Sequence, residues 1–558
     1  MAALAACIGL ATAAQAQTSG QTDIGASVDE RSLYGTFLAG RNAMLSGEGG
    51  EAARRLAEAA RAAPEDGFLR ERAFTANLFS GDVATAATFA PGPTPHQPPL
   101  HSLGRLTVAA DAYAAGRYDE AVQALGGDPL MYPHYTAAAL LRPWAMAASG
   151  DWKGATTPPD VQADRVSQLF GVLARAQIHE LRRQPDQAEA LYKELMADQA
   201  ASGLFRPMYG EFLERRGRRA EAIRLYEEGL AAAPDEVSLR VAKMRAERKG
   251  RPPKAPTLQE GAAQGLGFAA AVMNAQRQTE LSLAYLRLAL RIDPTLHQGW
   301  LLAGDALAKT RDEDGAREAW GRVPQTSGFY SEARSKIVYS LQGSGQGEAA
   351  LAMAQETARQ RPNDPRAQLT LADMLRTADR HDEAVALLDR MIAGGSADWR
   401  LHYMRAISLD RLDRWPEAEA DLQKALEMAP AEAEILNYLG YAWIDRGVKV
   451  KEGMALVERA VASEPRSGAM QDSLAWAHYR LGDYAKAVEL LELAVGLTPA
   501  DPEINDHLGD AYWMVGRKDE ARFQWNRVLT LDPDAEQKAS AERKLKDGLA
   551  SPARDVAP

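Results

Sequence analysis

Cysteine is almost absent from this chain, because Cys7 is the only one among 558 residues. A single thiol cannot form a disulfide within the chain, and Cys7 lies in an apolar N-terminal stretch. Histidine is also scarce, and the nine histidines follow no metal-ligand spacing. The sequence therefore predicts no disulfide framework, no thiol nucleophile, no metal site and no cofactor.

Positive charge is also in short supply. The formal net charge is −11 and the isoelectric point is near 5.5, and no dense run of Lys and Arg occurs. Proteins that bind DNA or RNA need a basic surface that displaces counterions from the phosphates. The charge balance therefore argues against nucleic acid as the main partner.

Long apolar runs are missing beyond the N-terminus. Residues 1–16 are apolar and rich in alanine, but a membrane-spanning helix needs about 20 residues. They match a secretory signal peptide with an A-x-A cleavage site that ends at Ala16, and we expect a flexible segment at 17–30. The prediction is a periplasmic or envelope-anchored protein. Two alternatives stay open: lipidation of Cys7, whose context resembles a bacterial lipobox, and an uncleaved N-terminus in a cytoplasmic protein.

Catalytic motifs are incomplete wherever a short match occurs. The stretch "HELRRQ" at 179–184 begins like the zinc-protease motif H-E-x-x-H, but Arg183 stands where the second histidine ligand belongs. The stretch "GSGQGE" at 343–348 lacks the G-K-[S/T] end of a phosphate-binding loop, and no G-x-S-x-G occurs. We therefore expect no enzymatic activity, with an enzyme subunit as the less favoured alternative.

The sequence does contain an internal repeat. Prolines fall at Pro430, Pro465, Pro499 and Pro533, with spacings of 35, 34 and 34 residues. Each unit between them contains a Leu, then a small residue, then an aromatic residue or His three positions later, and a glycine ends the segment. The three sets are Leu439/Gly440/Trp443, Leu474/Ala475/His478 and Leu508/Gly509/Tyr512, with Gly447, Gly482 and Gly516 as the closing glycines.

This pattern resembles the tetratricopeptide repeat (TPR), a helix–turn–helix unit of 34 residues. The resemblance implies an all-α fold, a solenoid in which helix pairs stack into a right-handed superhelix. The small residues would let the two helices of a pair approach closely. Glycine would end the first helix in a left-handed cap, and proline would stop the second.

Proline-rich stretches interrupt the repeat phase. Residues 250–262, which include "GRPPKAPT", predict a break between two sub-arrays, a degenerate one at 31–249 and a regular one at 263–533. The polar segment at 534–549 predicts a helix that caps the last repeat. Residues 550–558 predict a loose tail.

The first helix of each C-terminal unit carries polar and aromatic side chains on one face. In the family that the chain resembles, this helix lines a concave groove through repeat positions 2, 5, 9, 12 and 13, which form one helical stripe. Peptide grooves combine aromatic contact area with hydrogen-bonding side chains. The predicted groove residues are Arg400, Tyr403, Asp410, Asn437, Tyr441, Asp445, Asp472, Trp476, Tyr479, Arg480, Asp506, Asp510 and Trp513, and the same stripe includes Ile407 and Arg411.

Two questions about this stripe concern its aromatic and acidic members. Packing between neighbouring repeats is an open alternative to ligand binding for Tyr441, Trp476 and Trp513. The carboxylate clamp of chaperone-binding repeats requires Asn at position 9, which here holds Ile407, Tyr441, Trp476 and Asp510. The clamp is therefore absent, and the acidity of the stripe predicts a ligand of basic or neutral character.

The cluster of Asp506, His507, Asp510 and Trp513 resembles a catalytic or metal site when it is considered alone. In the repeat phase, however, His507 has no second histidine one helical turn away. The other three residues fall on the predicted groove stripe. The cluster is therefore better interpreted as the last part of a binding groove.

The resemblance implies a non-catalytic scaffold or adaptor that binds a protein or peptide partner. The C-terminal repeats are similar to those of proteobacterial envelope TPR proteins and lipoproteins. That likeness implies a role in envelope assembly or in delivering substrates to a periplasmic processing protease. A cytoplasmic TPR scaffold is the alternative.

Overall fold

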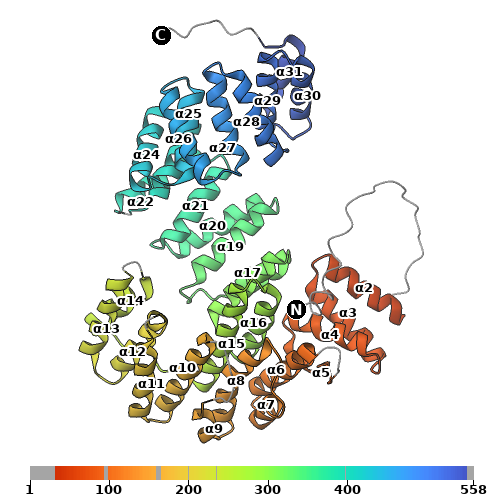
Figure 1. Cartoon of the computed structure of the whole chain (residues 1–558), viewed down its shortest axis with the longest axis vertical. Coiled ribbons are helices and arrows are strands. Elements are labelled where there is room, and N and C mark those ends of the chain that lie inside the picture. The colour runs from red at the N-terminus through yellow and green to blue at the C-terminus, as the bar shows by residue number, and fades with distance from the viewer. Residues whose placement is uncertain are drawn as a thin grey trace. The chain divides into compact units, whose positions relative to one another are not determined.

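The computed structural model is α-helical, with helices α2 to α31 and no strand among the described residues (Figure 1). This confirms the predicted all-α fold. The predicted signal peptide with Cys7, the segment at 17–30 and the tail at 550–558 lie outside the described residues. The structure describes residues 32–93, 98–158, 165–198, 200–233, 236–395 and 397–549. Among these residues, no helix combines the length and apolar character that crossing a membrane requires.

The chain forms two compact units, which divide between Ser344 and Gly345. The helices of unit 1 are α2 (Leu33–Leu45), α3 (Gly49–Ala62), α4 (Gly67–Ser80), α5 (Val83–Thr88), α6 (Pro98–Ala114), α7 (Tyr118–Leu125), α8 (His134–Ala148), α9 (Trp152–Thr156), α10 (Arg165–Leu181), α11 (Pro185–Ala197), α12 (Ser202–Arg215), α13 (Arg219–Ala232), α14 (Val237–Glu247), α15 (Leu258–Ala275), α16 (Thr279–Ile292), α17 (His297–Lys309), α18 (Glu313–Gly321) and α19 (Tyr330–Gly343).

Unit 2 consists of one leading helix, five helix pairs and a final helix. Its helices are α20 (Gly347–Gln360), α21 (Pro365–Thr377), α22 (His381–Ala393), α23 (Trp399–Arg411), α24 (Trp415–Met428), α25 (Ala433–Asp445), α26 (Val450–Ser463), α27 (Gly468–Arg480), α28 (Tyr484–Leu497), α29 (Pro502–Met514), α30 (Lys518–Val528) and α31 (Ala535–Asp547). In each pair the first helix is called the A helix and the second the B helix. The A helices are α21, α23, α25, α27 and α29.

The ends of these helices follow from particular residue types. Gly447 and Gly516 adopt positive φ angles of 67° and 87° directly after an A helix, a backbone region that glycine enters without steric cost. Pro499 follows a B helix, and Asp501 then accepts hydrogen bonds from the first backbone N–H groups of α29. The sequence pattern predicted both the glycine turn and the proline stop.

Small residues allow the A and B helices of a pair to approach closely. A Cβ atom built on Gly440 would lie 2.7 Å from the carbonyl oxygen of Gly453, well inside van der Waals contact. In the last pair, a Cβ on Gly509 would lie 2.5 Å from the ring of Trp525. The Trp525 side chain is fully buried at this place, so the glycine provides the space that the indole fills.

In unit 1, the hairpin of α15 and α16 packs against the earlier helices α4, α6, α8 and α10 (Figure 1). Nearly every side chain of α16 is buried, including Tyr285. The Tyr285 hydroxyl lies 2.9 Å from His134 Nδ1, and Arg291 forms an ion pair with Asp111 at 2.9 Å. The side of unit 1 formed by these earlier helices is therefore covered by the chain's own hairpin.

The position of this hairpin changes the expected division of the chain. Residues 250–257 lack helix, as their prolines predict. However, α15, which follows them, packs on α8 and α10 and therefore belongs to unit 1. The division falls at Ser344 and Gly345 rather than at 250–262, so the expected array at 263–533 is split between the two units. The burial of α16 against earlier helices joins it to unit 1 despite the break in the helix at 250–257.

Candidate functional site

The predicted groove residues all lie on A helices of unit 2. Helix α25 packs against α27, and α27 packs against α29, so consecutive A helices form one continuous face. We call the side formed by α21, α23, α25, α27 and α29 the A-helix face. Of the predicted residues, Arg400, Tyr403 and Asp410 lie on α23, Asn437, Tyr441 and Asp445 on α25, Asp472, Trp476, Tyr479 and Arg480 on α27, and Asp506, Asp510 and Trp513 on α29.

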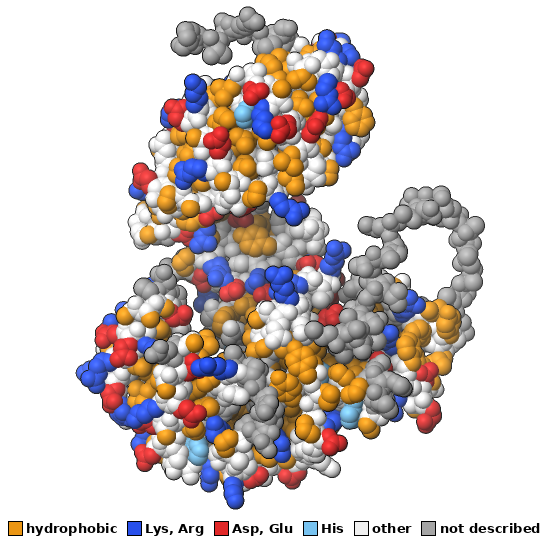
Figure 2. Space-filling model, in the orientation of Figure 1, with side chains coloured by type: hydrophobic (Ala, Val, Ile, Leu, Met, Phe, Trp, Pro, Cys, Tyr) orange, Lys and Arg blue, Asp and Glu red, His pale blue; other side chains and the backbone are white. Residues whose placement is uncertain are grey.

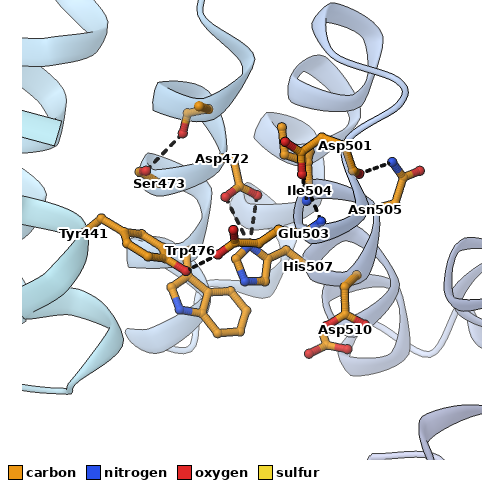
Figure 3. A network of polar contacts seen from close by, with 12 residues as sticks. Tyr441, Asp472, Ser473, Trp476, Asp501, Glu503, Ile504, Asn505, His507 and Asp510 are labelled. Carbon is orange, nitrogen blue, oxygen red and sulfur yellow. Dashed lines mark hydrogen bonds and ion pairs between the residues drawn. The ribbon is translucent and has the colours of Figure 1, made fainter. Parts of the chain in front are cut away.

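A hydrogen bond links A helices that are two repeats apart. The Tyr441 hydroxyl on α25 donates to Glu503 Oε1 on α29 at 2.5 Å (Figure 3). Burial raises the pKa of Tyr441, and the Glu503 carboxylate raises it further. The phenol therefore keeps its proton for this hydrogen bond. Tyr441 is thus bonded within the protein, across the intervening helix α27.

His507 forms a buried ion pair with Asp472. His507 Nδ1 lies 2.9 Å from Asp472 Oδ1, and only 9% and 6% of the two side chains are exposed. Burial lowers the pKa of His507, but the Asp472 carboxylate more than offsets this effect and the pKa rises to about 9. The imidazole is therefore protonated at neutral pH and carries a buried positive charge.

Aromatic stacking covers this ion pair. The Trp476 ring stacks on the His507 ring, with centroids 4.0 Å apart and an interplanar angle of 13°. Its ring also stacks on Tyr479 at 4.5 Å and 7°, while its Nε1 atom lies 3.4 Å from Asp445 Oδ1. An indole face favours a cation such as the imidazolium. Trp476 is therefore held by stacking against two rings, Tyr479 and His507, and Figure 3 shows it beside His507.

The acidic residues of α29 are bound by the last helix. Lys544 on α31 places its Nζ atom 2.6 Å from Asp506 Oδ2 and 2.8 Å from Asp510. Asp510 also accepts a hydrogen bond from Trp525 Nε1 at 3.0 Å. The carboxylates of Asp506 and Asp510 are therefore bound by Lys544 and Trp525 within unit 2. Lys544 and the protonated His507 offset part of the acidity expected for the stripe at this end.

Trp513 is covered by residues at the C-terminal end of α31. Its Nε1 atom donates to the Leu549 carbonyl oxygen at 3.2 Å, and its ring lies against Gly548. Lys518 Nζ lies 4.9 Å from the Trp513 ring centroid. The segment that was predicted to cap the last repeat thus lies directly on a predicted groove residue.

Other predicted residues also have internal contacts. Arg400 forms an ion pair with Asp398, the N-cap of α23, at 2.7 Å, and Arg480 donates to the Asp445 carbonyl oxygen. The Asn437 Oδ1 atom is buried without a hydrogen-bond partner among the described residues. Within the same residues, no group of three or more His, Cys, Asp or Glu side chains is arranged to hold a metal ion.

A hollow of about 390 Å³ opens on the A-helix face between α21, α23 and α25. It lies within unit 2 and includes Asp379 of the loop before α22 and His381, the first residue of α22. Of the predicted groove residues, Tyr403 lines it. The full lining consists of Arg376, Thr377, Asp379, His381, Tyr403, Ile407, Arg411 and Tyr438.

Two tyrosines form one wall of the hollow. The rings of Tyr403 and Tyr438 meet edge to face, with centroids 6.0 Å apart and an interplanar angle of 84°. The Tyr438 hydroxyl donates to Asp410 Oδ2 at 2.9 Å, and Arg446 forms an ion pair with the same carboxylate. Burial raises the pKa of Tyr403 to about 12, and Glu434 adds to the effect. Burial also raises the pKa of Tyr438, so both phenols are neutral hydrogen-bond donors at physiological pH.

The hollow contains donors that the protein itself does not use. Arg411 has no ion pair or hydrogen bond to any residue that the structure describes, and its side chain is exposed. The Tyr403 hydroxyl likewise has no hydrogen bond within the described part of the chain. Arg376 is bound to Asp373 at 2.9 Å. The hollow therefore differs from the C-terminal end of the face, where the charged groups are paired.

Only part of this lining is predictable from the sequence. The groove stripe includes Tyr403, Ile407 and Arg411, but Arg376 and Tyr438 were not among the predicted site residues. Arg376 stands at position 12 of the preceding repeat when Pro365 is aligned with Trp399, so extending the stripe by one repeat would have found it. Tyr438 lies beside the stripe, and only the packing of its ring on Tyr403 places it in the wall.

Charge on the surface is mixed. On the face shown in Figure 2, Lys and Arg side chains of unit 2 alternate with Asp and Glu. No basic stripe of the kind that follows a phosphate backbone is seen on this face.

Comparison with known proteins places repeats in the C-terminal part of the chain. A tetratricopeptide-repeat family model matches residues 336–398, 403–465, 449–502 and 474–536. A TPR repeat-containing protein of Pseudomonas aeruginosa is 30% identical over 139 residues, which are 25% of this chain and 23% of that protein. The matched part of the chain thus spans about a quarter of the length of this relative.

Solved structures with similar stretches were also found. The Cut9–Hcn1 hetero-tetramer of APC/C is 13% identical, with 93% of this chain and 97% of that chain covered, at a TM-score of 0.42. A tetratricopeptide-repeat protein from Parabacteroides merdae is 13% identical, with coverage of 45% and 97%, at a TM-score of 0.37. MamA is 21% identical, with coverage of 30% and 95%, at a TM-score of 0.26.

Proposed function

We propose, on the premise that this chain is a tetratricopeptide-repeat protein, that it is a non-catalytic scaffold whose A-helix face in unit 2 binds a segment of a protein partner. Tetratricopeptide repeats generally mediate contacts between proteins. The face offers aromatic rings and hydrogen-bonding side chains on consecutive helices, which is the chemistry that peptide recognition uses.

The α15–α16 hairpin covers the corresponding surface of unit 1, which supports assigning the binding face to unit 2. Its helices α4, α6, α8 and α10 contact the α15–α16 hairpin. Contacts such as Tyr285 with His134 fix this hairpin in place. A partner segment would have to displace buried apolar side chains of α16 to reach the same surface, which is unfavourable. Unit 2 contains no such inserted hairpin among its described helices, so its A-helix face is the better binding surface.

The observation that carries the proposal is the hollow between α21, α23 and α25. Its wall combines two tyrosine rings with an unpaired guanidinium and an unpaired hydroxyl. Its volume of about 390 Å³ lies within the range of ligand pockets, about 300–1,000 Å³. The aromatic residues closer to the C-terminus contact other repeats, Tyr441 to Glu503 two repeats on and Trp476 to His507 in the next repeat, and would support the shape of the face.

The proposed location is the periplasm or the cell envelope, and the proposed role is assembly of envelope machinery or delivery of substrates to a protease. Support comes from the apolar N-terminal residues 1–16 with their A-x-A site and from the likeness of the repeats to envelope proteins. A cytoplasmic scaffold is the alternative. Cell fractionation followed by N-terminal sequencing distinguishes them: cleavage after Ala16 supports export, whereas an intact N-terminus in the cytoplasmic fraction contradicts it.

Site-specific photo-crosslinking in producing cells tests the binding face. A photoreactive phenylalanine analogue at Ile407, inside the hollow, should give defined crosslinked products that mass spectrometry identifies. The same residue at Arg390, exposed on the B helix α22, is the matched control. Products from Ile407 that disappear in a Tyr403→Ala variant support the proposal. Identical products from both positions, or none from Ile407, would contradict it.

A further inference from the structure

The donors around the hollow outnumber the acceptors that line it. Arg411 and the Tyr403 hydroxyl are unpaired within the described chain, and Arg376 uses only part of its guanidinium on Asp373. The one carboxylate in the lining belongs to Asp379, whose side chain is 96% exposed and lies 3.5 Å from His381 Nε2. A ligand that supplies acceptors would therefore satisfy groups that are now left to solvent.

The hollow contains one cation, Arg411, that pairs with no carboxylate of the described chain. The whole chain carries −11, whereas the lining contains two guanidinium groups and one carboxylate, and the Arg376 guanidinium is paired with Asp373. Other arginines of the A helices are occupied: Arg400 pairs with Asp398 and Arg405 with Asp421, and Arg480 donates to the Asp445 carbonyl oxygen. Arg411 is therefore the available cation of this hollow, and the earlier expectation of a basic or neutral ligand does not suit this place.

We propose that the hollow is a carboxylate-binding subsite for an acidic side chain, Asp or Glu, in an extended segment of the protein partner. This assignment rests on the proposed function and names the chemistry that the face selects. The planar guanidinium of Arg411 can donate two parallel N–H groups to a carboxylate, and such charge-assisted pairs are stronger than neutral hydrogen bonds. The Tyr403 hydroxyl supplies a further donor.

The shape of the hollow favours a side chain over a bare anion. Ile407 and the rings of Tyr403 and Tyr438 form an apolar part of the lining, which suits the methylene groups of Glu and an apolar neighbour. A small inorganic anion would leave this part uncovered. The A-helix face also continues beyond the hollow toward α27. A segment can therefore pass through, so a chain end is not required.

Binding of defined peptide pools to the full-length protein provides the test, measured by fluorescence anisotropy. The first probe is a fluorescein-labelled nonapeptide pool, blocked at both ends, with Glu fixed at its centre and an equal mixture of Ala, Leu, Phe, Ser and Tyr at the other positions. The second pool has Gln at the centre. The third has Gln at the centre and a free C-terminal carboxylate. We expect at least tenfold tighter binding of the Glu pool than of the blocked Gln pool.

Variants of the protein assign the effect to particular residues. Arg411→Gln should weaken binding of the Glu pool roughly 10- to 100-fold, because it removes a charge-assisted hydrogen-bond pair. Tyr403→Phe removes only a hydroxyl and should weaken binding roughly three- to tenfold. Arg390→Gln removes the same charge from α22 outside the hollow and should leave the affinity unchanged. Thermal unfolding followed by circular dichroism checks that each variant is folded.

The outcomes separate this inference from the proposed function. Equal binding of the blocked Glu and Gln pools, with loss of both in Tyr403→Ala, would overturn carboxylate recognition but keep the binding face. Preferred binding of the pool with the free terminus would overturn the side-chain assignment and indicate a chain end. Equal weakening by Arg411→Gln and Arg390→Gln would reduce the effect to general charge and also overturn the assignment. Absence of binding by every pool would contradict both proposals.

Discussion

The Asp472→Asn substitution removes the carboxylate that keeps His507 protonated inside unit 2. The folded pKa of His507 is about 9, against an ordinary value of 6.5. Because the folded pKa is raised, the stabilisation is fully present below pH 6.5 and is lost as the pH rises toward 9. The two pKa values differ by about 2.5, and a difference of one in pKa corresponds to about 1.36 kcal/mol. The ion pair therefore contributes about 3 kcal/mol to the free energy of unfolding.

Urea unfolding of the full chain, followed by circular dichroism at pH 6, 7.5 and 9.5, measures this contribution. At pH 6, Asp472→Asn should lower the free energy of unfolding of the C-terminal unit by about 3 kcal/mol. The difference from the wild type should shrink as the pH approaches 9.5, because the wild type loses the same interaction.

The pair of His478 and Asp483 offers a matched control in the same unit. Their contact distance is 3.3 Å, but 55% of the Asp483 side chain is exposed. Asp483 is also the N-cap of α28, and Asn is as good an N-cap as Asp. Asp483→Asn should therefore change the free energy of unfolding by less than about 0.5 kcal/mol. The reasoning fails if Asp472→Asn keeps the pH dependence of the wild type, or if its cost is the same at pH 6 and pH 9.5.

Three further predictions concern packing, acid stability and the last helix. Gly440→Ala should destabilise unit 2 by about 1–3 kcal/mol in urea titrations, because its Cβ would lie 2.7 Å from the Gly453 carbonyl oxygen. Gly496→Ala is the control: a Cβ at Gly496 meets nothing within 4 Å, so this variant should stabilise unit 2 by up to about 1 kcal/mol. Burial lowers the pKa of His134 to about 4, so unit 1 should lose up to about 3 kcal/mol as the pH falls from 6.5 to 4; an equally steep acid profile for His134→Gln would contradict this. Lys544→Met should lower the unfolding free energy by about 3 kcal/mol, because it leaves the carboxylates that Lys544 binds without their cation; an unchanged urea midpoint would show that the pair contributes nothing.

The repeat register was predictable because it depends on local residue chemistry. Proline after the B helix and Gly447 or Gly516 after the A helix act within a few residues of their own position. Gly440 and Gly509 are visible for a similar reason, since a repeated small residue marks a place of close helix contact. These signals recur every 34 or 35 residues and were therefore readable in the C-terminal half.

The packing of α15 and α16 was not predictable in the same way. The contact between Tyr285 and His134 joins residues 151 positions apart, and no repeat spacing encodes it. The proline-rich residues 250–257 do interrupt the helix, but a local break does not state which surface the next helix covers. Tertiary burial of the apolar helix α16 decides where the compact units divide, and a local break in the chain does not encode it.

At the candidate site, the stripe placed each predicted residue on an A helix but did not reveal which were already paired. His507 and Asp472 are 35 positions apart and meet only when α27 packs against α29. Lys544 reaches Asp506 and Asp510 from a helix that lies outside the repeats. The repeat positions indicate which face of the helix a side chain lies on. Whether that side chain is free to bind a ligand depends on its contacts with other helices.

The hydrogen bond between Tyr441 and Glu503 also limits how this array could change its length. Its two residues are 62 positions apart and come from A helices separated by one other A helix. Duplication of one 34-residue unit between them would place an additional A helix in that interval, and deletion would remove α27 with Asp472 and Trp476. Either event would break the hydrogen bond between Tyr441 and Glu503, which joins two different repeats. Repeat number in this part of the gene is therefore expected to be constrained.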